Sequence, residues 1–474
     1  MGTLKCVVSL ALLVIGSFAA VHVPKQRDVL KEIAEVENSV HVGKKWVVLV
    51  AGSHRWSNYR HQADICHAYQ IMLRNNIPKK NIITMMYDDI AYNPNNPTPG
   101  VIINQPNGTN VYEGVEIDYK GDDVTPAHFL KIILGDKEGM KSVGTGRVVE
   151  GGAWDTIFIN FADHGGSGVL CFPNGYLYAD QLNDALNTAF ETARYKKMLL
   201  YIEACESGSI FEGILSDDMN ILAVTAAGPR ENSWGCYCYS ESGDYATCLG
   251  DLFSVTWMED IDKTFFDSIM RKKSIFNDYN EIRQHVTLSN IMVYGDFDIG
   301  YEKLSTFIGY QKKIDKPSVM SLSKTIQNKM TVSSHDVSKC TMEYALASKK
   351  LTNLRKQELQ IELQKNDEMR FVIDNVFREI YLSVVKLRPK IMSDIGTFDK
   401  PEFLKLSLDM FPCYRSIVNK INENCFLVSQ NSYVLKRLRI ISNLCVIDKN
   451  IHGMFSNLVF KSCSRIPKNI VNVF

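Results

Sequence analysis

Continuous apolar runs, each ended by turn residues, recur along the first 300 residues. They are WVVLVAG from Trp46, IITMMYD from Ile82, DTIFINFADHGG from Asp155, MLLYIEACESG from Met198, ILAVTAAG from Ile221 and IMVYGD from Ile291. Because strands covered on both faces lack polar alternation, these runs indicate buried strands. Segments of helical character lie between them, at residues 59–74, 125–134 and 179–193. The alternation predicts an α/β fold with a mostly parallel sheet and helices on both faces.

The pattern changes after residue 308. Residues 309–339 are rich in Lys and Ser and have no sustained periodicity, so we expect an exposed linker there. Apolar residues then return at spacings of three and four, over 373–385 and again over 414–421, which is typical of amphipathic helices. The predicted organisation is an α/β domain at 21–308, a linker at 309–350 and an all-helical domain at 351–474.

Residues 1–20 have the pattern of a cleaved secretory signal peptide. Lys5 precedes an apolar run from Cys6 to Ile15, and small residues follow it. The run is too short to cross hydrocarbon, and no other stretch is a candidate membrane span. In the secretory pathway, Asn107 of Asn107-Gly108-Thr109 would be a glycosylation acceptor on a predicted loop.

The cysteines fit a compartment that permits disulfides. The chain has 12 cysteines, and 11 would remain after loss of Cys6, so at least one thiol is unpaired. The disulfide candidates of the helical domain are Cys413, Cys425, Cys445 and Cys463. Four cysteines allow three pairings, among which the sequence does not choose. A zinc site is disfavoured because no CxxC spacing is present.

The net charge of zero conceals two oppositely charged parts. Residues 309–474 carry 27 Lys and Arg against 15 Asp and Glu, whereas residues 1–308 carry 26 against 38. A basic segment can bind nucleic acid. This one has no interleaved aromatic residues and lies in a chain expected to be secreted, so we favour an intramolecular acidic partner and expect no nucleic acid.

Two predicted strands end in groups that can carry out chemistry. ADHGG places His164 after one strand, and EACESG places Cys205 after another. The carboxyl ends of parallel strands meet at one edge of a sheet, and neighbouring strands lie about 5 Å apart. His164 could therefore take the proton of the Cys205 thiol, whose unperturbed pKa is about 8.5.

Neighbouring residues could assist such a thiol. The backbone amides of Gly165 and Cys205 could face a developing oxyanion, and Ser207 and Ser209 could cap a helix that begins after Cys205. The alternative is structural, because free cysteine is among the most frequently buried residues. The same structural role is expected for Cys66, on an apolar helical face.

ADHGGSG and YIEACESGS resemble the legumain family, asparaginyl endopeptidases of the caspase-like clan. The resemblance extends to NYRHQADICHAYQ from Asn58, MMYDDIAYNPNNPTPG from Met85 and NQPNG from Asn104, and covers about residues 46–301. The cysteines and helical spacing of the tail look like the family's C-terminal prodomain. The resemblance implies a caspase-like α/β/α sandwich with a helical prodomain. It also implies a cysteine endopeptidase that cleaves after asparagine through a thioester acyl-enzyme and is made as an inactive zymogen.

Site residues follow from the matching motifs. Cys205 matches the nucleophile, His164 the general base and Asn58 the residue that supports the histidine, with Gly165 next to them. Asp163 matches a position that the family can convert to a succinimide. The implied pocket for the substrate asparagine consists of Arg60, His61, Glu203, Ser233 and Asp251.

That pocket suits an amide, which offers one acceptor and two donors to an arginine and to carboxylates. A protonated aspartate would mimic asparagine, so cleavage after aspartate is expected at acid pH. The chain departs from the family at Asn232-Ser233, where two serines are more usual.

The resemblance also implies partners and regulation. Peptides with asparagine before the cleaved bond, cystatin-type inhibitors, and the prodomain as an intramolecular inhibitor are expected. We expect no cofactor or metal, because His54, His61 and His67 lack ligand spacing. Acid should weaken the charge attraction to the tail, and Asn328 is a candidate self-processing site. The protein is expected in the secretory pathway, where it would be delivered to lysosomes or endosomes or secreted into an acidic lumen.

Three alternatives remain. An amine that reaches the thioester before water would make the chain a ligase with the same site. A catalytically silent binding protein would keep the cleft without turnover. A serine esterase, suggested by HGGSG, is disfavoured because no G-x-S-x-G motif is present.

Overall fold

The computed structural model describes residues 43–264, 272–310, 330–347, 351–464 and 466. The predicted signal peptide and Asn328 lie outside these ranges. Within them, no helix is both long and apolar enough to cross a membrane.

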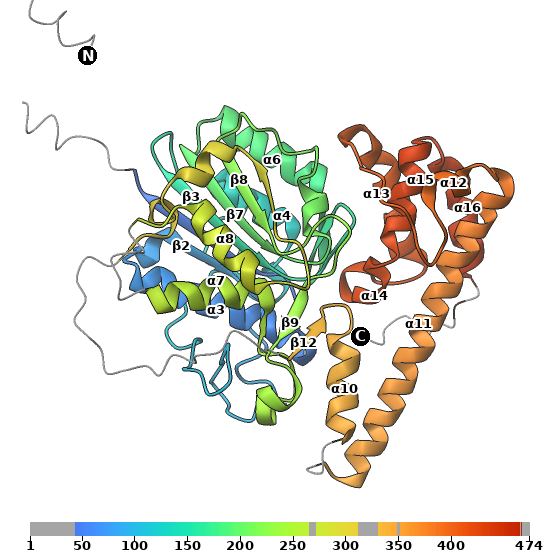
Figure 1. Ribbon diagram of the computed structural model, residues 1–474, viewed down its shortest axis with the longest axis horizontal. Helices are drawn as coiled ribbons and strands as arrows, with labels where there is room; N and C mark the ends of the chain where they lie inside the picture. The colour runs from blue at the N-terminus through green and yellow to red at the C-terminus, as the bar shows by residue number, and fades with distance from the viewer. Residues whose placement is uncertain (1–42, 265–271, 311–329, 348–350, 465, 467–474) are drawn as a thin grey trace, which may run out of the picture. The chain divides into compact units, whose positions relative to one another are not determined.

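Six strands form the central sheet, in the order β11-β8-β7-β3-β1-β2 (Figure 1). Their bounds are β1 Lys45–Ala51, β2 Ile82–Met85, β3 Thr156–Ala162, β7 Lys197–Glu203, β8 Ile221–Thr225 and β11 Met292–Gly295. All neighbouring strands are parallel except β11, which runs antiparallel to β8. The mostly parallel sheet predicted from six apolar runs is therefore confirmed.

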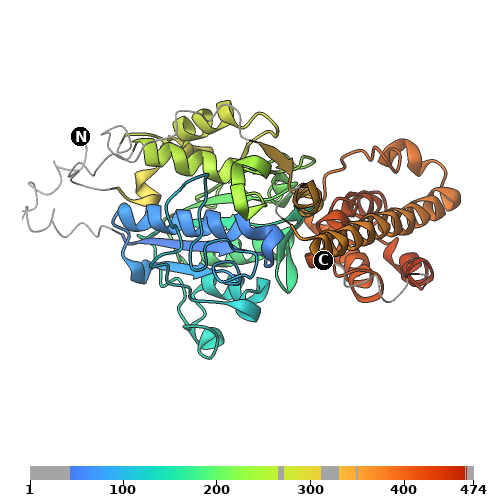
Figure 2. The same cartoon turned by 90° about the horizontal axis from the view of Figure 1, so that it is seen from below.

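Helices cover both faces of this sheet (Figures 1 and 2). The helices α3 Tyr59–Arg74, α7 Leu252–Thr264 and α8 Ile275–His285 pack on one face, and α4 Pro126–Leu134 and α6 Ala179–Glu191 on the other. Alternate residues of β1 explain this arrangement: Val47 and Leu49 join the cluster of α3, whereas Val48 and Val50 join that of α4 and α6. Burial on both faces is why the strands read as continuous apolar runs.

The helix boundaries have local causes. Thr125 caps α4 by accepting a hydrogen bond from the His128 amide, and Pro126 occupies its first turn. Gly135 ends α4 in the left-handed conformation, with φ 71°. These signals lie within one residue of the predicted range 125–134.

The C-terminal part is helical, as predicted. It contains α10 Val337–Ala347, α11 Asn353–Leu387, α12 Ile391–Ile395, α13 Phe411–Asn424, α14 Ser432–Leu435, α15 Leu438–Ile447 and α16 His452–Cys463. Disulfides Cys413–Cys445 and Cys425–Cys463 tie α13 to α15 and the end of α13 to α16. A third disulfide, Cys238–Cys248, lies in the α/β part.

Residues 331–347 are not the exposed linker that we predicted. Residues Thr331–Ser333 form β12, which pairs antiparallel with β9 Trp234–Cys236, and β9 pairs in turn with β10 Gly250–Asp251. Ser334 and His335 are buried directly after β12. A three-residue strand is too short to show a period, and its partner lies about a hundred residues earlier, so no local pattern announces it.

Candidate active site

The ends of β3 and β7 bring the predicted catalytic pair to one place. Ala162 is the register partner of Glu203 on these neighbouring strands, and the Asp163 amide donates to the Glu203 carbonyl at 3.0 Å. His164 and Cys205 each follow two residues after that pair. Gly165 comes so close that a Cβ there would lie 2.5 Å from the Cys205 carbonyl oxygen, so only glycine fits.

Asn58, directly before α3, fixes the imidazole of His164. Asn58 Nδ2 donates to the His54 carbonyl at 3.0 Å, which turns Oδ1 toward His164 Nε2 at 2.9 Å. Nε2 is therefore assigned the proton, and the lone pair lies on Nδ1, which is buried without a hydrogen-bond partner among the described residues. Burial, with the charges of Arg60 and His335, lowers the pKa of His164 well below its usual value. The ring is neutral and can accept a proton.

Cys205 is fully buried beside Ser233. Its Sγ accepts from the Ser233 amide at 3.3 Å and lies 3.5 Å from the Ser233 hydroxyl. Burial, together with the charge of Glu206, raises the pKa of Cys205 to about 12, although the Ser233 hydrogen bonds and Arg60 act in the opposite direction. The thiol is therefore protonated in this structure.

The predicted helix after Cys205 is wrong. Residues Ser207–Ile210 form one 3₁₀ turn that follows Glu206 in the left-handed conformation, with φ 53°. Ser207 Oγ donates to the Ala227 carbonyl at 3.3 Å, and Ser209 Oγ donates to the Glu206 carbonyl at 2.6 Å. Neither serine caps a helix, so no helix dipole acts on the thiol.

A pocket of buried charge lies next to this pair. Arg60, in the first turn of α3, donates from Nε to Asp251 Oδ1 at 2.8 Å and from Nη2 to Ser334 Oγ at 2.7 Å. Glu203, the last residue of β7, accepts from the amide and hydroxyl of Ser254 through Oε2, each at 3.0 Å. Glu203 Oε1 and Asp251 Oδ2 are buried without hydrogen-bond partners among the described residues.

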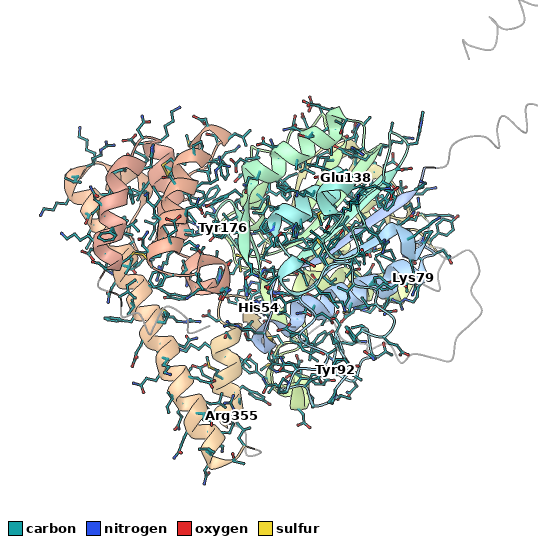
Figure 3. The ribbon with its side chains drawn as sticks, turned by 180° about the vertical axis from the view of Figure 1, so that it is seen from behind. His54, Lys79, Tyr92, Glu138, Tyr176 and Arg355 are labelled. Atoms are coloured by element: carbon teal, nitrogen blue, oxygen red, sulfur yellow. A yellow bond between two sulfur atoms is a disulfide. The ribbon has the colours of Figure 1, made fainter. Side chains whose placement is uncertain are left out.

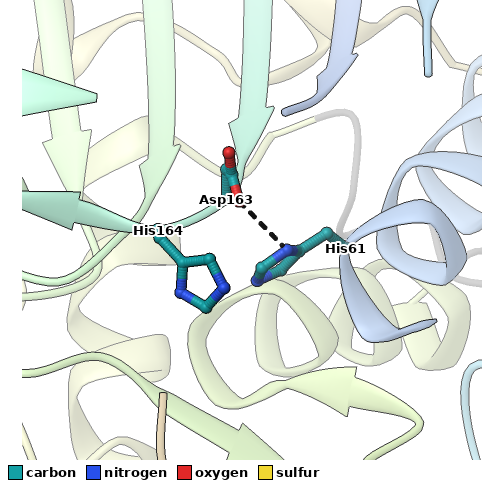
Figure 4. A group of neighbouring side chains, drawn as sticks. All are labelled: His61, Asp163 and His164. Carbon is teal, nitrogen blue, oxygen red and sulfur yellow. Dashed lines mark ion pairs between the residues drawn. The ribbon is translucent and has the colours of Figure 1, made fainter. Parts of the chain in front are cut away.

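His61 completes the pocket from the same turn of α3 (Figure 4). Its Nδ1 lies 2.6 Å from Ser53 Oγ and 3.4 Å from Asp163 Oδ1, and its Nε2 lies 3.5 Å from Asp251 Oδ2. Burial, then the charges of Arg60 and His164, lowers the pKa of His61 well below its usual value. A neutral His61 contributes no positive charge to the pocket.

Carboxylates outnumber cations in this pocket. Among the described residues, Asp64, Asp163, Glu203 and Asp251 are all buried here, and the charge of Arg60 acts on the last three. Burial raises the pKa of each, and the nearby Asp251 raises those of Asp64, Glu203 and Asp163 further. The pocket therefore favours a neutral ligand that brings hydrogen-bond donors.

A metal ion is a competing occupant. His61, Asp163 and His164 each offer one ligand atom, and these atoms lie within 4.8 Å of one another (Figure 4). One nitrogen of each ring is already occupied, by Ser53 in His61 and by Asn58 in His164. The charge of Arg60, which acts on Asp163, also disfavours a cation at this group.

The structure brings together Cys205, His164, Asn58 and Gly165, and likewise Arg60, His61, Glu203 and Asp251. Ser233 lies beside the thiol, and its carbonyl faces the chain after β12. Sequence reasoning missed Asp64, Ser254, Ser334 and His335. An aspartate four residues after Arg60, on a helix with few exposed positions, could have indicated Asp64.

The Peptidase C13 family model matches residues 45–312 of this chain. Legumain from Homo sapiens is 40% identical over 407 residues, which cover 85% of this chain and 89% of that protein. Vacuolar-processing enzyme from Citrus sinensis is 38% identical over 423 residues, covering 85% of this chain and 82% of that one. The crystal structure of Caspase-1 from Spodoptera frugiperda aligns with 58% of this chain and 93% of its own, at 11% identity and a TM-score of 0.32.

The matched range contains every strand of the central sheet, the thiol, the imidazole and the charged pocket. The predicted α/β/α fold with a helical C-terminal part is the fold of this structure. The relatives align with the helical part as well, because their matches extend over 85% of the chain. This chain therefore belongs to the Peptidase C13 family, and it is a cysteine endopeptidase that acts on peptides and proteins.

Proposed function

We propose that this peptidase cleaves peptide bonds after asparagine. The observation that carries the proposal is one buried pocket beside Cys205 that holds an arginine donor and two carboxylate oxygens without hydrogen-bond partners among the described residues. The oxygen of an asparagine amide would accept from Arg60 Nη2, where Ser334 Oγ now lies. Its two N–H groups would donate to Glu203 Oε1 and Asp251 Oδ2. A side chain without both functions would leave buried groups unpaired, which gives strong discrimination.

The chemistry that we propose uses Cys205 as nucleophile and His164 as base. The Cys205 proton passes to His164 Nδ1 while Sγ attacks the carbonyl carbon after which the chain is cut. The C–N bond breaks, the imidazolium returns the proton to the leaving amine, and a thioester remains. Water then attacks the thioester, losing its proton to Nδ1, and Cys205 recovers its proton. The amide of Gly165 is our candidate for stabilising the oxyanion.

The same site would accept a second substrate residue, aspartate, and a second acceptor of the acyl group, an amine. A protonated aspartate presents one acceptor and one donor and is expected to enter the pocket at acid pH. An amine in place of water would give ligation through the same thioester.

We also infer that the chain is made as an inactive precursor. Support comes from residues 331–335, which run along β9 into the pocket: the Ser334 amide donates to the Ser233 carbonyl at 3.0 Å, and Ser334 Oγ takes the Arg60 donor. Serine is too short to reach Glu203 Oε1, which has no hydrogen-bond partner in the part of the chain that the structure describes. The segment thus occupies the substrate position with a residue that the pocket does not favour.

Helices of the C-terminal part hold this segment in place. Arg370 of α11 and Ser432 of α14 both donate to the His335 carbonyl, at 3.2 and 3.4 Å. Tyr414 of α13 ties the helical part to the α/β part by donating to the Ser167 carbonyl at 2.5 Å. A cavity of about 680 Å³ is lined by His54, Asn58 and His164 of the α/β part and by residues of α10 and α11 that include Arg355. Figure 3 labels His54 and Arg355. We propose that these helices act as the intramolecular inhibitor.

Further expectations stay proposals. Asn107 is exposed on its loop and is a candidate for glycosylation. Processing at Asn328, inhibition by cystatin-type proteins and delivery to an acidic compartment of the secretory pathway are proposed on the family resemblance.

The function is tested with the full-length chain incubated at acid pH and assayed on Ala-Ala-Asn, Ala-Ala-Gln and Ala-Ala-Leu reporters. We expect hydrolysis of the asparagine reporter above the other two, and complete loss in Cys205→Ala. Preferred hydrolysis of the leucine reporter would contradict the assigned pocket, and activity that survives in Cys205→Ala would contradict the nucleophile.

A further inference from the structure

We propose that Asn232 makes this peptidase selective for a hydroxyl-bearing residue, serine or threonine, immediately before the asparagine. The inference rests on the proposed function, since it uses the same cleft and the same pocket. Its basis is the segment of the chain that lies in that cleft and marks the path of a peptide.

The first step is the register of that segment. On the antiparallel pair β12 and β9, Thr331 faces Cys236, Val332 faces Gly235 and Ser333 faces Trp234. The pairing continues for one more residue, because the Ser334 amide donates to the Ser233 carbonyl. Four consecutive residues therefore run along β9 as a peptide strand would.

The second step assigns the positions. Ser334 Oγ accepts from Arg60 in the charged pocket at 2.7 Å, so Ser334 occupies the place of the residue after which the chain is cut. Ser333 then occupies the place of the residue before the cleaved residue. Successive side chains of a strand point to opposite sides, so the side chain of Ser333 contacts different groups from that of Ser334.

The side chain that contacts Ser333 is that of Asn232. Asn232 Nδ2 donates to Ser333 Oγ at 3.0 Å, and both side chains are half-buried. Asn232 directly precedes Ser233, whose amide contacts the Cys205 sulfur, so its position on the rim is fixed by the catalytic residues. A hydroxyl can donate or accept, and it satisfies the amide whichever end the asparagine presents.

Selectivity for a hydroxyl arises because other side chains at this position leave the Asn232 amide without a hydrogen bond. Alanine would lose the hydrogen bond, and valine would place a methyl group against the amide and shield it from water. The net worth of one such bond corresponds to a preference of about 2- to 10-fold. Threonine and valine have the same shape, so their ratio isolates the hydroxyl.

The experiment compares Ala-Thr-Asn, Ala-Val-Asn and Ala-Ala-Asn reporters on the full-length chain after acid incubation. We expect kcat/KM for the threonine peptide to exceed that for the valine peptide by about 2- to 10-fold. Asn232→Ala should bring the ratio close to one without changing the preference for Asn over Gln at the cleaved residue. Asn232→Asp should keep the threonine preference, since its carboxylate accepts from the hydroxyl.

Asn174→Ala is the matched control, because this exposed amide on the catalytic part also makes one side-chain hydrogen bond, to Asp122. It should leave the threonine to valine ratio unchanged. Equal rates for both peptides in the unaltered chain, or a threonine preference that survives in Asn232→Ala, would overturn the inference while Ala-Ala-Asn is still cut. Failure to cut any asparagine peptide would instead refute the proposed function.

Discussion

Burial sets the protonation of the groups around Cys205 more strongly than any single charged neighbour. It is the largest influence on Cys205, His164 and Asp163, raising the pKa of the two acids and lowering that of the imidazole. Thiol and imidazole are therefore both neutral in the closed state. Because a thiolate is the better nucleophile, we expect proton transfer to accompany attack on the substrate in this closed environment.

The hydrogen bond between Asn58 and His164 leads to the first prediction. Asn58→Ala should lower kcat about 10- to 100-fold with a small change in KM, because Nε2 loses its acceptor and the ring loses its fixed tautomer. Asn58→Asp keeps an acceptor and adds a negative charge, which raises the pKa of the imidazole and moves the acid limb of the kcat profile to higher pH. Equal kcat for Asn58→Ala and the unaltered chain on Ala-Ala-Asn would contradict this role.

Glu203 leads to the second prediction. Its Oε1 has no hydrogen-bond partner within the described ranges, and an asparagine N–H is proposed to fill that place. Glu203→Gln should lower kcat/KM for Ala-Ala-Asn about 10- to 100-fold, since one buried donor is left without a strong acceptor. The exposed Glu113→Gln serves as control. An unchanged ratio of Asn to Asp reporters in Glu203→Gln would exclude contact with the substrate amide.

At the scale of elements, the segment that lies in the cleft is β12 with the residues after it, and it contacts β9 and α3. The pairing with β9 is antiparallel and joins segments about a hundred residues apart, and Arg60 of α3 closes it by binding Ser334. Under the proposed inhibition, a strand with serine in the asparagine position binds without meeting the preference of the pocket. This difference of one side chain is open to a direct test.

Ser334→Asn is expected to turn the inhibitory strand into a substrate. The amide would reach Glu203 Oε1 and Asp251 Oδ2, and the chain should be cut between residues 334 and 335 at acid pH. Intact-mass measurement of the fragments checks this. Ser333→Asn, which puts the amide on the opposite side of the strand, should give no cut after residue 333, and Cys205→Ala should abolish the new cut. An intact Ser334→Asn chain would refute the strand position.

The sequence predicted those strands and helices whose patterns are contained in a single stretch of the chain. The strand ends that carry His164 and Cys205 follow long apolar runs, and α3 carries Arg60 and His61 in a single turn, so their meeting at one sheet edge follows from topology. The role of residues 331–335 depends on pairing with a distant strand, for which composition gives no indication. The prediction of a helix after Cys205 is wrong for a similar reason. Ser-Gly-Ser also fits a 3₁₀ turn, and contacts with the distant residues Ala227 and Gly166 stabilise that turn.

At the scale of the whole molecule, the opposite charges of the two parts meet in specific ion pairs. Arg439 of α15 pairs with Glu206 at 2.9 Å, and Arg415 of α13 pairs with Asp180 at 2.7 Å, in each case a base from the helical part with an acid of the α/β part. Both acids are largely buried. The charge asymmetry seen in the sequence thus has a physical counterpart at the covered cleft.

His335 gives this assembly a dependence on pH. Burial, with the charges of Lys436 and Arg370, lowers the pKa of His335 to about 4, although Asp336 and the Ser432 contact raise it. His164 lies close enough to interact as well. In a released strand the pKa would return to about 6.5. A base whose pKa is depressed in the docked state stabilises docking above pH 6.5, and that contribution is lost as pH falls toward 4.

Residues 331–335 should therefore leave the cleft more readily in acid, with an opening constant that rises by up to about 10²-fold between pH 6.5 and 4. Amide hydrogen exchange of this segment, in a Cys205→Ala chain that cannot cut itself, measures the opening after correction for intrinsic exchange. Glu206, whose pKa burial raises, acts in the opposite direction, so the informative quantity is the difference between His335 and His335→Gln. That variant should lack the acid-dependent opening, whereas His128→Gln, on α4, should retain it. The same pH dependence with and without His335 would assign the acid response to other groups.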